Sequence, residues 1–206
     1  MRLVARNVAV DRGGRRLFSG LSFVVEAGQA LMVVGANGAG KSSLLRAIAG
    51  LLRTAEGDVR LEGGDEEKSV GEQAHFIAHA DALKNALTAG ENLEFWAGAL
   101  GAAAPKEAAR TALASVGLAH VVDMPVGVLS AGQKRRAALA RALVVPRPLW
   151  LLDEPTTALD AAARALLAKL MGEHLSAAGL IVAATHSALG LEKAATLKLG
   201  DVEAAA

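Results

Sequence analysis

A glycine-rich segment near the start of the chain has the composition of a phosphate-binding loop. Residues 35–42 read Gly-Ala-Asn-Gly-Ala-Gly-Lys-Ser and match G-x-x-x-x-G-K-[ST] in full. Glycines let successive backbone N–H groups curve around an anion, and a helix that begins there adds its positive end. Lys41 would place its charge against the β- and γ-phosphates, and the Ser42 hydroxyl would join a Mg²⁺ shell. The predicted nucleotide-binding residues are Gly35, Ala36, Asn37, Gly38, Ala39, Gly40, Lys41, Ser42 and Ser43.

Two adjacent carboxylates follow the apolar run Leu149–Leu152. Ligands of parallel α/β sheets bind beyond the carboxyl ends of the strands, so Asp153 and Glu154 should face the phosphate loop. Asp153 is suited to hold Mg²⁺, directly or through water. Glu154 is placed to orient or deprotonate an attacking water. Alone, the pair would equally suit a turn, a helix cap or a solvated charge, but beside a complete phosphate loop the catalytic interpretation is favoured.

A second helix start lies at Leu129-Ser-Ala-Gly-Gln133. Ser130 and Gln133 satisfy the S-x-x-Q pattern of a capping box, which is a purely structural account. A helix start made of small residues also presents free N–H groups to a phosphate. Local physics leaves both interpretations open.

The elements that must position these residues form an α/β pattern. Leu31–Val34, Leu149–Leu152 and Leu180–Ala184 are strand-length apolar runs. Each is followed by polar or Gly-rich residues and then a helical pattern, which predicts strand–loop–helix units and a mainly parallel sheet. The helix after the first run opens at Lys41 and carries an apolar stripe formed by Leu44, Leu45, Ile48, Leu51 and Leu52.

The rest of the chain predicts an antiparallel patch and a helical insertion. Leu3–Val10 and Leu21–Val25, joined by Asp11–Gly14, alternate loosely, and Asp58–Glu62 is a further short strand. Residues 64–74 are polar and read as a loop, whereas residues 91–122 are Ala-rich and helical, with a break near residues 98–105. We expect a single domain, residues 1–206, with a helical subdomain over approximately residues 84–140.

Composition limits the function classes. The chain has 206 residues, a formal net charge of +1, 3% aromatic residues and no Cys. The absence of a basic excess argues against nucleic acid as a partner, and the absence of Cys excludes disulfides and thiolate metal sites. No apolar run approaches the ~18–20 residues needed to cross a bilayer, and no secretory signal is evident. Any membrane role must therefore come through a partner.

Taken in order, these motifs resemble the ABC ATPase family over nearly the whole chain. The resemblance rests on the phosphate loop, LSAGQ, the strand ending in Asp153-Glu154-Pro155, Ala158-Leu159-Asp160 and a His after a strand. It implies a P-loop NTPase fold with a RecA-like core, ATP and Mg²⁺ as cofactors, and a second copy of the chain as partner. The signature would consist of Ser130, Ala131, Gly132 and Gln133, with Ala131 as its one departure from LSGGQ.

By this resemblance two copies face each other head to tail, and Ser130 and Gly132 of one cap the γ-phosphate held by Lys41 of the other. Asp160 resembles a loop residue that communicates across this interface. His186 resembles the switch histidine that contacts the γ-phosphate and so joins Glu154 as a catalytic candidate; on its own it would be an ordinary surface or capping residue.

Two positions depart from the family pattern. The family has a Gln that senses Mg²⁺ and meets the membrane partner, where this chain has His79, an imidazole whose charge depends on pH. The family also stacks adenine on an aromatic ring, where Arg12 is nearest in register. A guanidinium plane can stack on a base, but a solvated Arg in a turn fits equally well.

A narrower resemblance joins LFSGLSF (Leu17–Phe23), the His79 segment, LSAGQKRRAALARAL (Leu129–Leu143) and PLWLLDEPTTALD (Pro148–Asp160). These are similar to the ATP-binding subunits of cytochrome c biogenesis transporters, the haem exporter ATPases. The resemblance implies a peripheral subunit on the cytoplasmic face of a bacterial inner membrane, coupled to integral-membrane transporter subunits of that complex. The alternatives are an ATPase of another ABC exporter or importer, and a non-transport ABC ATPase.

Overall fold

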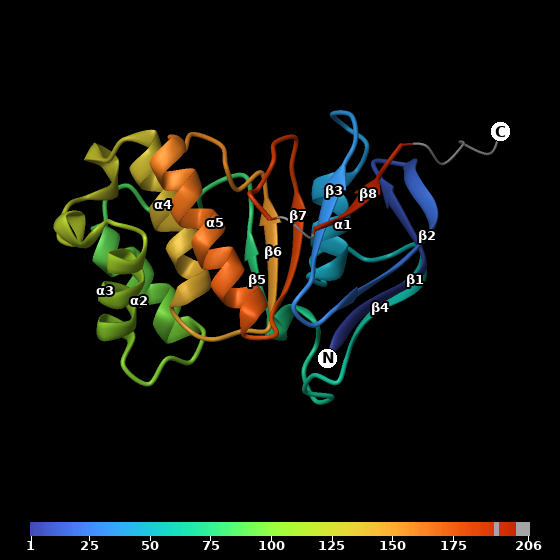
Figure 1. Ribbon diagram of the computed structural model, residues 1–206, viewed down its shortest axis with the longest axis horizontal. Helices are drawn as coiled ribbons and strands as arrows, with labels where there is room; N and C mark the ends of the chain where they lie inside the picture. Colours follow the sequence, from blue (N-terminus) through green and yellow to red (C-terminus); the bar gives the residue numbers. More distant parts are fainter. Residues whose placement is uncertain (192–193, 201–206) are drawn as a thin grey trace.

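The computed structural model describes residues 1–191 and 194–200, which form two sheets and the helices that flank them (Figure 1). The strands are β1 Arg2–Arg12, β2 Arg15–Glu26, β3 Ala30–Val34, β4 Glu56–Glu62, β5 Ala74–Ile77, β6 Leu149–Asp153, β7 Leu180–Ala184 and β8 Ala195–Lys198. The α-helices are α1 Lys41–Ile48, α2 Ala89–Ala99, α3 Pro105–Ser115, α4 Ala131–Ala140 and α5 Ala161–Ser176. Short 3₁₀ turns lie at η1 Gly71–Gln73, η2 Ala119–Val121, η3 Val126–Val128 and η4 Arg141–Leu143.

The parallel sheet has the order β5-β6-β7-β3-β8, and all of its neighbouring strands pair in parallel. Every residue of β6 and β7 is buried, as expected of strands covered on both faces. Alternate residues of β6 point in opposite directions. Leu149 and Leu151 join the core on the α1 side, whereas Trp150 and Leu152 join the core beneath α5.

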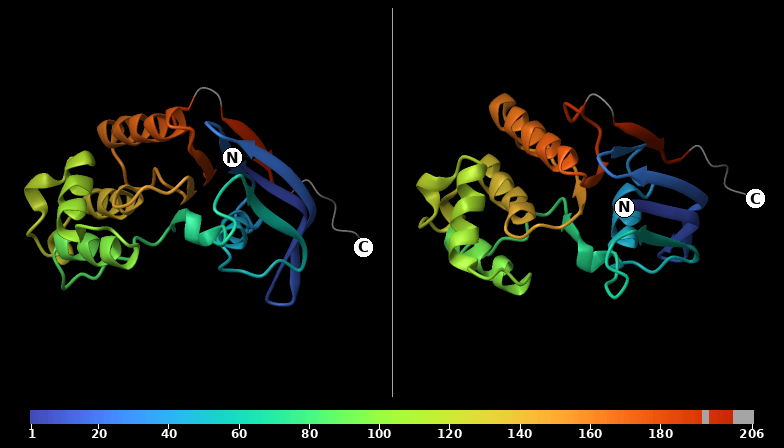
Figure 2. Two further views of the ribbon diagram at one scale, coloured as in Figure 1. Left: turned by 90° about the horizontal axis from the view of Figure 1, so that it is seen from below. Right: turned by 60° about the horizontal axis from the view of Figure 1, so that its bottom comes forward.

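Helix α1 lies between the two sheets, as the views in Figures 1 and 2 agree. Its buried residues Leu44, Leu45 and Ile48 confirm the first part of the predicted stripe. The helix ends at Ile48, so its predicted continuation to residues 51 and 52 is wrong, and Leu51 is 66% exposed. The physical reason is Gly50, which takes a left-handed φ of 71° and turns the chain away from the helix. Leu52 lies beyond the helix but still packs against the same core.

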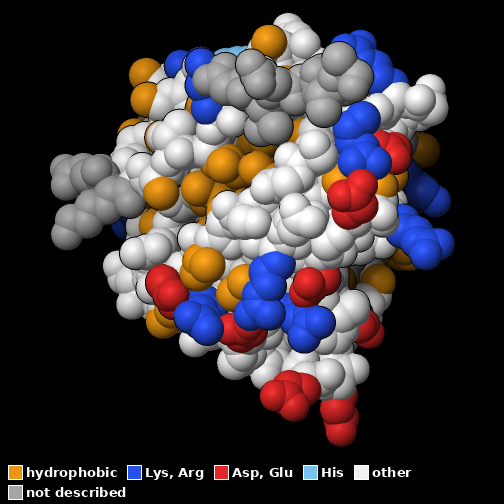
Figure 3. All heavy atoms as spheres, turned by 90° about the vertical axis from the view of Figure 1, so that its right-hand side faces the viewer, with side chains coloured by type: hydrophobic (Ala, Val, Ile, Leu, Met, Phe, Trp, Pro, Cys, Tyr) orange, Lys and Arg blue, Asp and Glu red, His pale blue; other side chains and the backbone are white. Residues whose placement is uncertain are grey.

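The antiparallel sheet has the order β2-β1-β4 and confirms the predicted patch. Its strands are longer than the alternation in the sequence predicts. The predicted loop over residues 64–74 is wrong at its end, because η1 and the first residue of β5 lie there. The sheet carries exposed ion pairs such as Arg2–Glu62 and Arg16–Glu56. Figure 3 shows positive and negative side chains interspersed on this side of the molecule, with no patch of one sign.

The helices α2, α3 and α4 lie at the end of the molecule opposite the antiparallel sheet (Figures 1 and 2) and share a hydrophobic core of their own. The predicted break near residues 98–105 is confirmed, since α2 ends at Ala99 and α3 begins at Pro105. The limits of the subdomain at residues 84 and 140 stay a prediction. Residues 192–193 and 201–206 of the predicted single domain lie outside the described residues.

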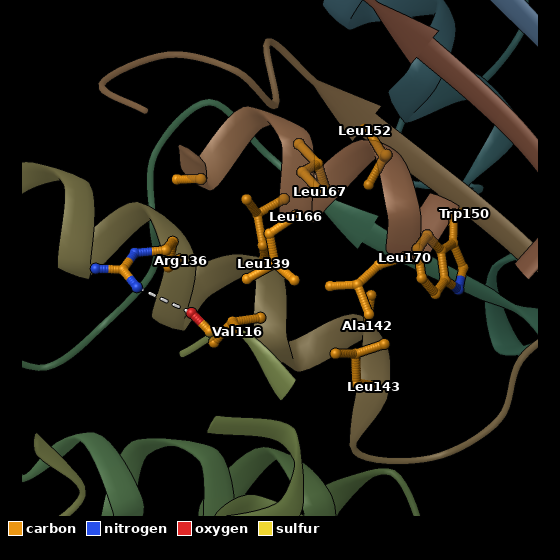
Figure 4. Close-up of a pocket in the computed structure, with 11 residues that line it drawn as sticks. Val116, Arg136, Leu139, Ala142, Leu143, Trp150, Leu152, Leu166, Leu167 and Leu170 are labelled. Atoms are coloured by element: carbon orange, nitrogen blue, oxygen red, sulfur yellow. Dashed lines mark hydrogen bonds between the residues drawn. The ribbon is translucent and has the colours of Figure 1, made fainter. Parts of the chain in front are cut away.

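An apolar pocket between α4 and α5 marks the contact of this helical part with the parallel sheet (Figure 4). Leu139 reaches it from α4, Leu167 and Leu170 from α5, and Trp150 from β6. None of the helices in the described part of the chain is both long enough and apolar enough to span a membrane.

The burial of β6 predicts a large stability difference between two leucines. Leu151→Ala removes a side chain that is 0% exposed and should lower the free energy of unfolding by about 2–5 kcal/mol. Leu51→Ala, at a 66% exposed position, should change it by less than about 0.5 kcal/mol. Urea denaturation measures both, and equal effects would contradict the assignment of Leu51 to a position beyond the helix.

A buried histidine in β5 predicts a pH-dependent stability. His75 is 3% exposed and its Nε2 donates to the Val145 carbonyl at 2.8 Å. Burial lowers the pKa of His75 from 6.5 to about 4. The unfolded chain takes up this proton at a higher pH than the folded chain does. The free energy of unfolding therefore falls as the pH drops from 6.5 to about 4, by about 3 kcal/mol in total.

Urea denaturation between pH 4 and pH 7 measures this loss. His75→Gln should show a weaker pH dependence than the wild-type chain, whereas His120→Gln, at an exposed position, should show an unchanged one. The same pH dependence in all three proteins would refute the role of His75.

Candidate functional site

The parallel strands β3 and β6 end at the same edge of the sheet (Figure 1). An open pocket is formed by residues at this edge. Its walls come from five segments far apart in sequence. The lining residues are Arg12, Leu17, Asn37, Gly38, Gly40, Lys41, Ser42, Ser43, His79, Asp153, Glu154 and His186. The structure thus brings together most of the residues that the sequence predicts for nucleotide, metal and catalysis.

The loop from Gly35 to Gly40 connects β3 to α1 and depends on glycine. Gly35 has a φ of 146°, and a Cβ there would collide with the Leu199 carbonyl oxygen, so only glycine fits. Gly40 is the N-cap of α1 and has no side chain to bond the first N–H groups of the helix. These groups and the positive end of the helix dipole therefore remain available to an anion.

Lys41 is 8% exposed and its Nζ donates to the carbonyl oxygens of Gly35 at 2.8 Å and Ala36 at 3.1 Å. The same Nζ lies 3.0 Å from Nε2 of His186. That nitrogen is also 3.1 Å from Oδ1 of Asn37. A single imidazole nitrogen either donates or accepts, so it satisfies only one of these two neighbours at a time.

Ser42 and Asp153 meet directly. The Ser42 hydroxyl donates to Oδ1 of Asp153 at 3.0 Å, although the two residues are 111 positions apart. Asp153 is 3% exposed and ends β6, and Ser42 lies in the first turn of α1. Two oxygen donors held at this spacing are the kind of ligand that Mg²⁺ takes from proteins.

Glu154 follows with an unusual backbone conformation. Its φ is 48°, in the left-handed region that non-glycine residues rarely adopt. Its N–H donates to the Ala184 carbonyl at the end of β7, at 2.8 Å. The side chain is 21% exposed, with Oε1 3.5 Å from Nε2 of His186. Backbone strain of this kind concentrates at functional sites, where the surrounding structure holds it in place.

The two departures from the family pattern both reach the pocket. His79 is exposed and lines the wall beyond the end of β5. Arg12 is exposed at the end of β1, and Leu17 of β2 lines the same pocket. Leu17 was not predicted, because an aliphatic residue in an alternating strand carries no signal that distinguishes a pocket wall from core. The roles of His79 and Arg12 stay predictions.

The signature segment lies apart from this pocket. Ser130 Oγ accepts from the Gln133 N–H at 3.2 Å and the Ser130 N–H donates to Oε1 of Gln133 at 2.9 Å, which confirms the predicted capping box. Ser130 and Ala131 are exposed, while a Cβ on Gly132 would meet the Ala158 carbonyl oxygen at 3.0 Å. Among the described residues, the pocket wall includes none of these signature positions.

Asp160 also lies outside the pocket wall as described. It is the N-cap of α5, and its Oδ1 accepts from the Ala163 N–H at 2.7 Å. This contact gives Asp160 a structural role that the family pattern does not mention. Its role across an interface between two copies stays a prediction.

A glycine-rich loop between a parallel strand and a helix, facing an acidic pair at the end of a nearby strand, defines a P-loop NTPase. Solved structures support this class. A putative ABC transporter ATP-binding protein from Pyrococcus furiosus has a TM-score of 0.82 at 24% identity, covering 97% of this chain and 98% of the other. The ATP-binding subunit of an ABC transporter has a TM-score of 0.84 at 25% identity, covering 97% and 86%.

Sequence comparisons identify the family. The family described as ABC transporter matches residues 18–157. A cytochrome c biogenesis ATP-binding export protein from Bradyrhizobium diazoefficiens is 52% identical over 98% of this chain and 100% of its own length. The protein of the same name from Rhodopseudomonas palustris is 54% identical over 97% and 98%. The chain belongs to the ABC transporter family, among the cytochrome c biogenesis ATP-binding export proteins, and is a nucleotide-binding ATPase of the ABC type.

The position of Lys41 predicts a specific loss of affinity. Lys41→Ala should weaken binding of ATP by about 10- to 100-fold, the effect expected of one charged hydrogen-bond donor. Equilibrium titration with a fluorescent ATP analogue measures this. Lys169→Ala, at a 72% exposed side chain on α5, provides the control and should bind as the wild-type chain does. Unchanged affinity in Lys41→Ala would contradict the assignment of the loop.

Proposed function

We propose that this chain hydrolyses ATP as the energy-coupling subunit of an ABC exporter that serves cytochrome c biogenesis. The observation that carries the proposal is the meeting of the phosphate loop with Asp153 and Glu154 in one pocket, in a chain about half identical to proteins of that name. The proposed location is the cytoplasmic face of the bacterial inner membrane, where the chain binds peripherally to integral-membrane subunits.

In the proposed reaction the loop N–H groups and Lys41 bind the β- and γ-phosphates of ATP. Glu154 orients the attacking water or accepts its proton, and its strained backbone at the end of β6 directs the carboxylate to the pocket. His186 contacts the γ-phosphate and, with nucleotide bound, exchanges its present neighbours Lys41 and Asn37 for a phosphate oxygen.

Mg²⁺ fits the donor set at Ser42 and Asp153, which are oxygen ligands 3.0 Å apart. Among the described residues no group of three or more His, Asp or Glu is placed to hold a metal ion. The remaining ligands would therefore be phosphate oxygens and water, as is usual for Mg²⁺ at nucleotide sites. When bound, the ion neutralises charge on the phosphates. His79, an imidazole at the same pocket, would meet the metal through water.

A second copy of the chain is part of the proposal. The start of α4 carries Ser130 and Ala131 on the surface, outside the chain's own pocket. A helix N-terminus of small residues suits the γ-phosphate held by a partner copy, and the pocket is open toward solvent. Asp160 would then lie at the interface between the two copies. The alternative exporter or importer would use the same ATPase chemistry with different membrane subunits.

The catalytic role of Glu154 predicts a loss of turnover without a loss of binding. Glu154→Gln should lower the ATP hydrolysis rate by about 10²–10⁴-fold, the range for removal of a general base, while ATP affinity is retained. In cells that depend on this chain, the same variant should abolish haem staining of c-type cytochromes. Hydrolysis by the purified protein and haem-stained gels of membrane fractions measure the two effects.

Glu173→Gln is the matched control, since Glu173 is a 60% exposed residue of α5, and it should hydrolyse ATP and support haem staining normally. Wild-type turnover in Glu154→Gln would refute the role of Glu154. Normal haem staining after deletion of the gene would refute the cytochrome c pathway and leave the ATPase unaffected.

A further inference from the structure

A buried arginine connects the helical part of the molecule to the catalytic edge of the sheet. Arg135 lies in the second turn of α4, and its side chain is 3% exposed. Arg135 is not among the described residues that line the nucleotide pocket. Its guanidinium instead contacts two backbone segments that do line the pocket, one around His79 and one around Glu154.

One nitrogen of the guanidinium bonds the segment that follows β5. Nη1 donates to the Ala78 carbonyl at 2.9 Å and to the His79 carbonyl at 3.3 Å. It also donates to Oδ1 of Asp81 at 3.1 Å, in an ion pair. Three contacts from one nitrogen hold residues 78–81 against α4, even though they lie more than 50 positions earlier in the chain.

The other nitrogen bonds the end of β6. Nη2 donates to the Asp153 carbonyl at 2.8 Å and to the Glu154 carbonyl at 2.9 Å. These are the carbonyls on either side of the left-handed φ of 48° at Glu154. Such a conformation persists only where the surroundings determine it, and charge-assisted hydrogen bonds are strong enough to do so.

The cost of burying this charge indicates a role beyond packing. Within the described residues Nε of Arg135 is buried without a hydrogen-bond partner, and the same is true of Arg141. Arg141 stacks 4.1 Å over the Trp96 ring, and its pKa is lowered to about 10, chiefly by burial and further by the charge of Arg135. Burying a charged group costs free energy that its partners must offset. The partners of Arg135 are mainly backbone carbonyls of the two segments that line the pocket.

We propose that Arg135 is a positioning residue for ATP hydrolysis: it fixes the backbone of Glu154 relative to residues 78–81, so that the Glu154 carboxylate stays directed at the pocket. This inference rests on the proposed function and adds a residue to it. Because one planar guanidinium holds both segments, a displacement of residues 78–81 moves the backbone of Glu154 as well. Because Arg135 is not among the described residues that line the pocket, the nucleotide should bind independently of it.

The geometry requires an arginine. A guanidinium presents several N–H donors in a rigid plane and can bond two segments on different sides at once, whereas a lysine ammonium is a point charge on a flexible stem. Arg135→Lys keeps the positive charge beside Asp81 but cannot reproduce both pairs of carbonyl contacts. Arg135→Lys should therefore lower the rate of hydrolysis although the positive charge beside Asp81 is kept.

Arg136 provides a matched control on the same helix. Its Nη1 donates to the Val116 carbonyl at 3.0 Å, the contact drawn in Figure 4, and to the Gly117 carbonyl at 3.4 Å. It therefore also joins α4 to a distant backbone segment, but that segment lies at the end of α3, away from the nucleotide pocket. Arg136→Met removes a comparable contact without touching residues 78–81 or 153–154.

The test compares Arg135→Met, Arg135→Lys and Arg136→Met in the full-length chain. In both Arg135 variants kcat should fall by about 100-fold, as for small displacements of a catalytic group, while KM and the Kd for ATP change by less than about 3-fold. Arg136→Met should keep the wild-type kcat. Thermal unfolding of all three variants shows how much of each change in kcat results from a change in stability.

Hydrogen exchange gives a readout that does not depend on turnover. The Glu154 amide, bonded to the Ala184 carbonyl, should exchange faster in both Arg135 variants than in Arg136→Met and the wild-type chain. Unchanged exchange, a wild-type kcat in Arg135→Lys, or parallel losses of kcat and ATP affinity that follow Tm would each overturn the proposal. Turnover of the wild-type chain in the same assay tests the proposed function separately.

Discussion

The site depends on the close approach of the phosphate loop and the end of β6, which the hydrogen bond between Ser42 and Asp153 shows. Ser42 follows β3 and Asp153 is the last residue of β6, two strands of one parallel sheet with β7 between them. Parallel pairing makes these strands end at the same edge, so a loop from the first third of the chain meets an acidic pair from the last third. The apolar residues of β6 and β7, all buried, keep this edge rigid. The arrangement of the polar groups in the pocket therefore depends on the hydrophobic packing of these strands.

The same edge collects charge that the rest of the core excludes. Lys41, Arg135 and Asp153 are among the few charged residues of the described chain that are almost fully buried. Their hydrogen-bond partners are mainly backbone carbonyls for Lys41 and Arg135 and the Ser42 hydroxyl for Asp153. The helical part and the parallel sheet also meet through apolar side chains of α4 and α5. Further polar contacts join them at β5, where His75 bonds the Val145 carbonyl and Arg147 bonds the Ala74 carbonyl.

Much of the fold and site was predictable because its signals are local. A few consecutive residues encode each of the phosphate loop, the three buried strands, and the capping box of Ser130 and Gln133. Strand β8 was not predicted, because its residues are mostly exposed and form no apolar run. Helix α1 is shorter than its apolar stripe because Gly50 ends it. The contacts of Arg135 could not be predicted, since they join segments 18 to 57 positions away.

In the proposed reaction the ends of β3 and β6 together hold the phosphates of a magnesium nucleotide. Calorimetric titration with a non-hydrolysable ATP analogue, with and without Mg²⁺, tests it most directly on the wild-type chain, Asp153→Asn and the control Asp58→Asn, whose carboxylate pairs with Arg60 on the antiparallel sheet. We expect Mg²⁺ to strengthen binding to the wild-type chain and to Asp58→Asn but to have little effect on Asp153→Asn. An equal effect of Mg²⁺ on all three proteins would contradict it.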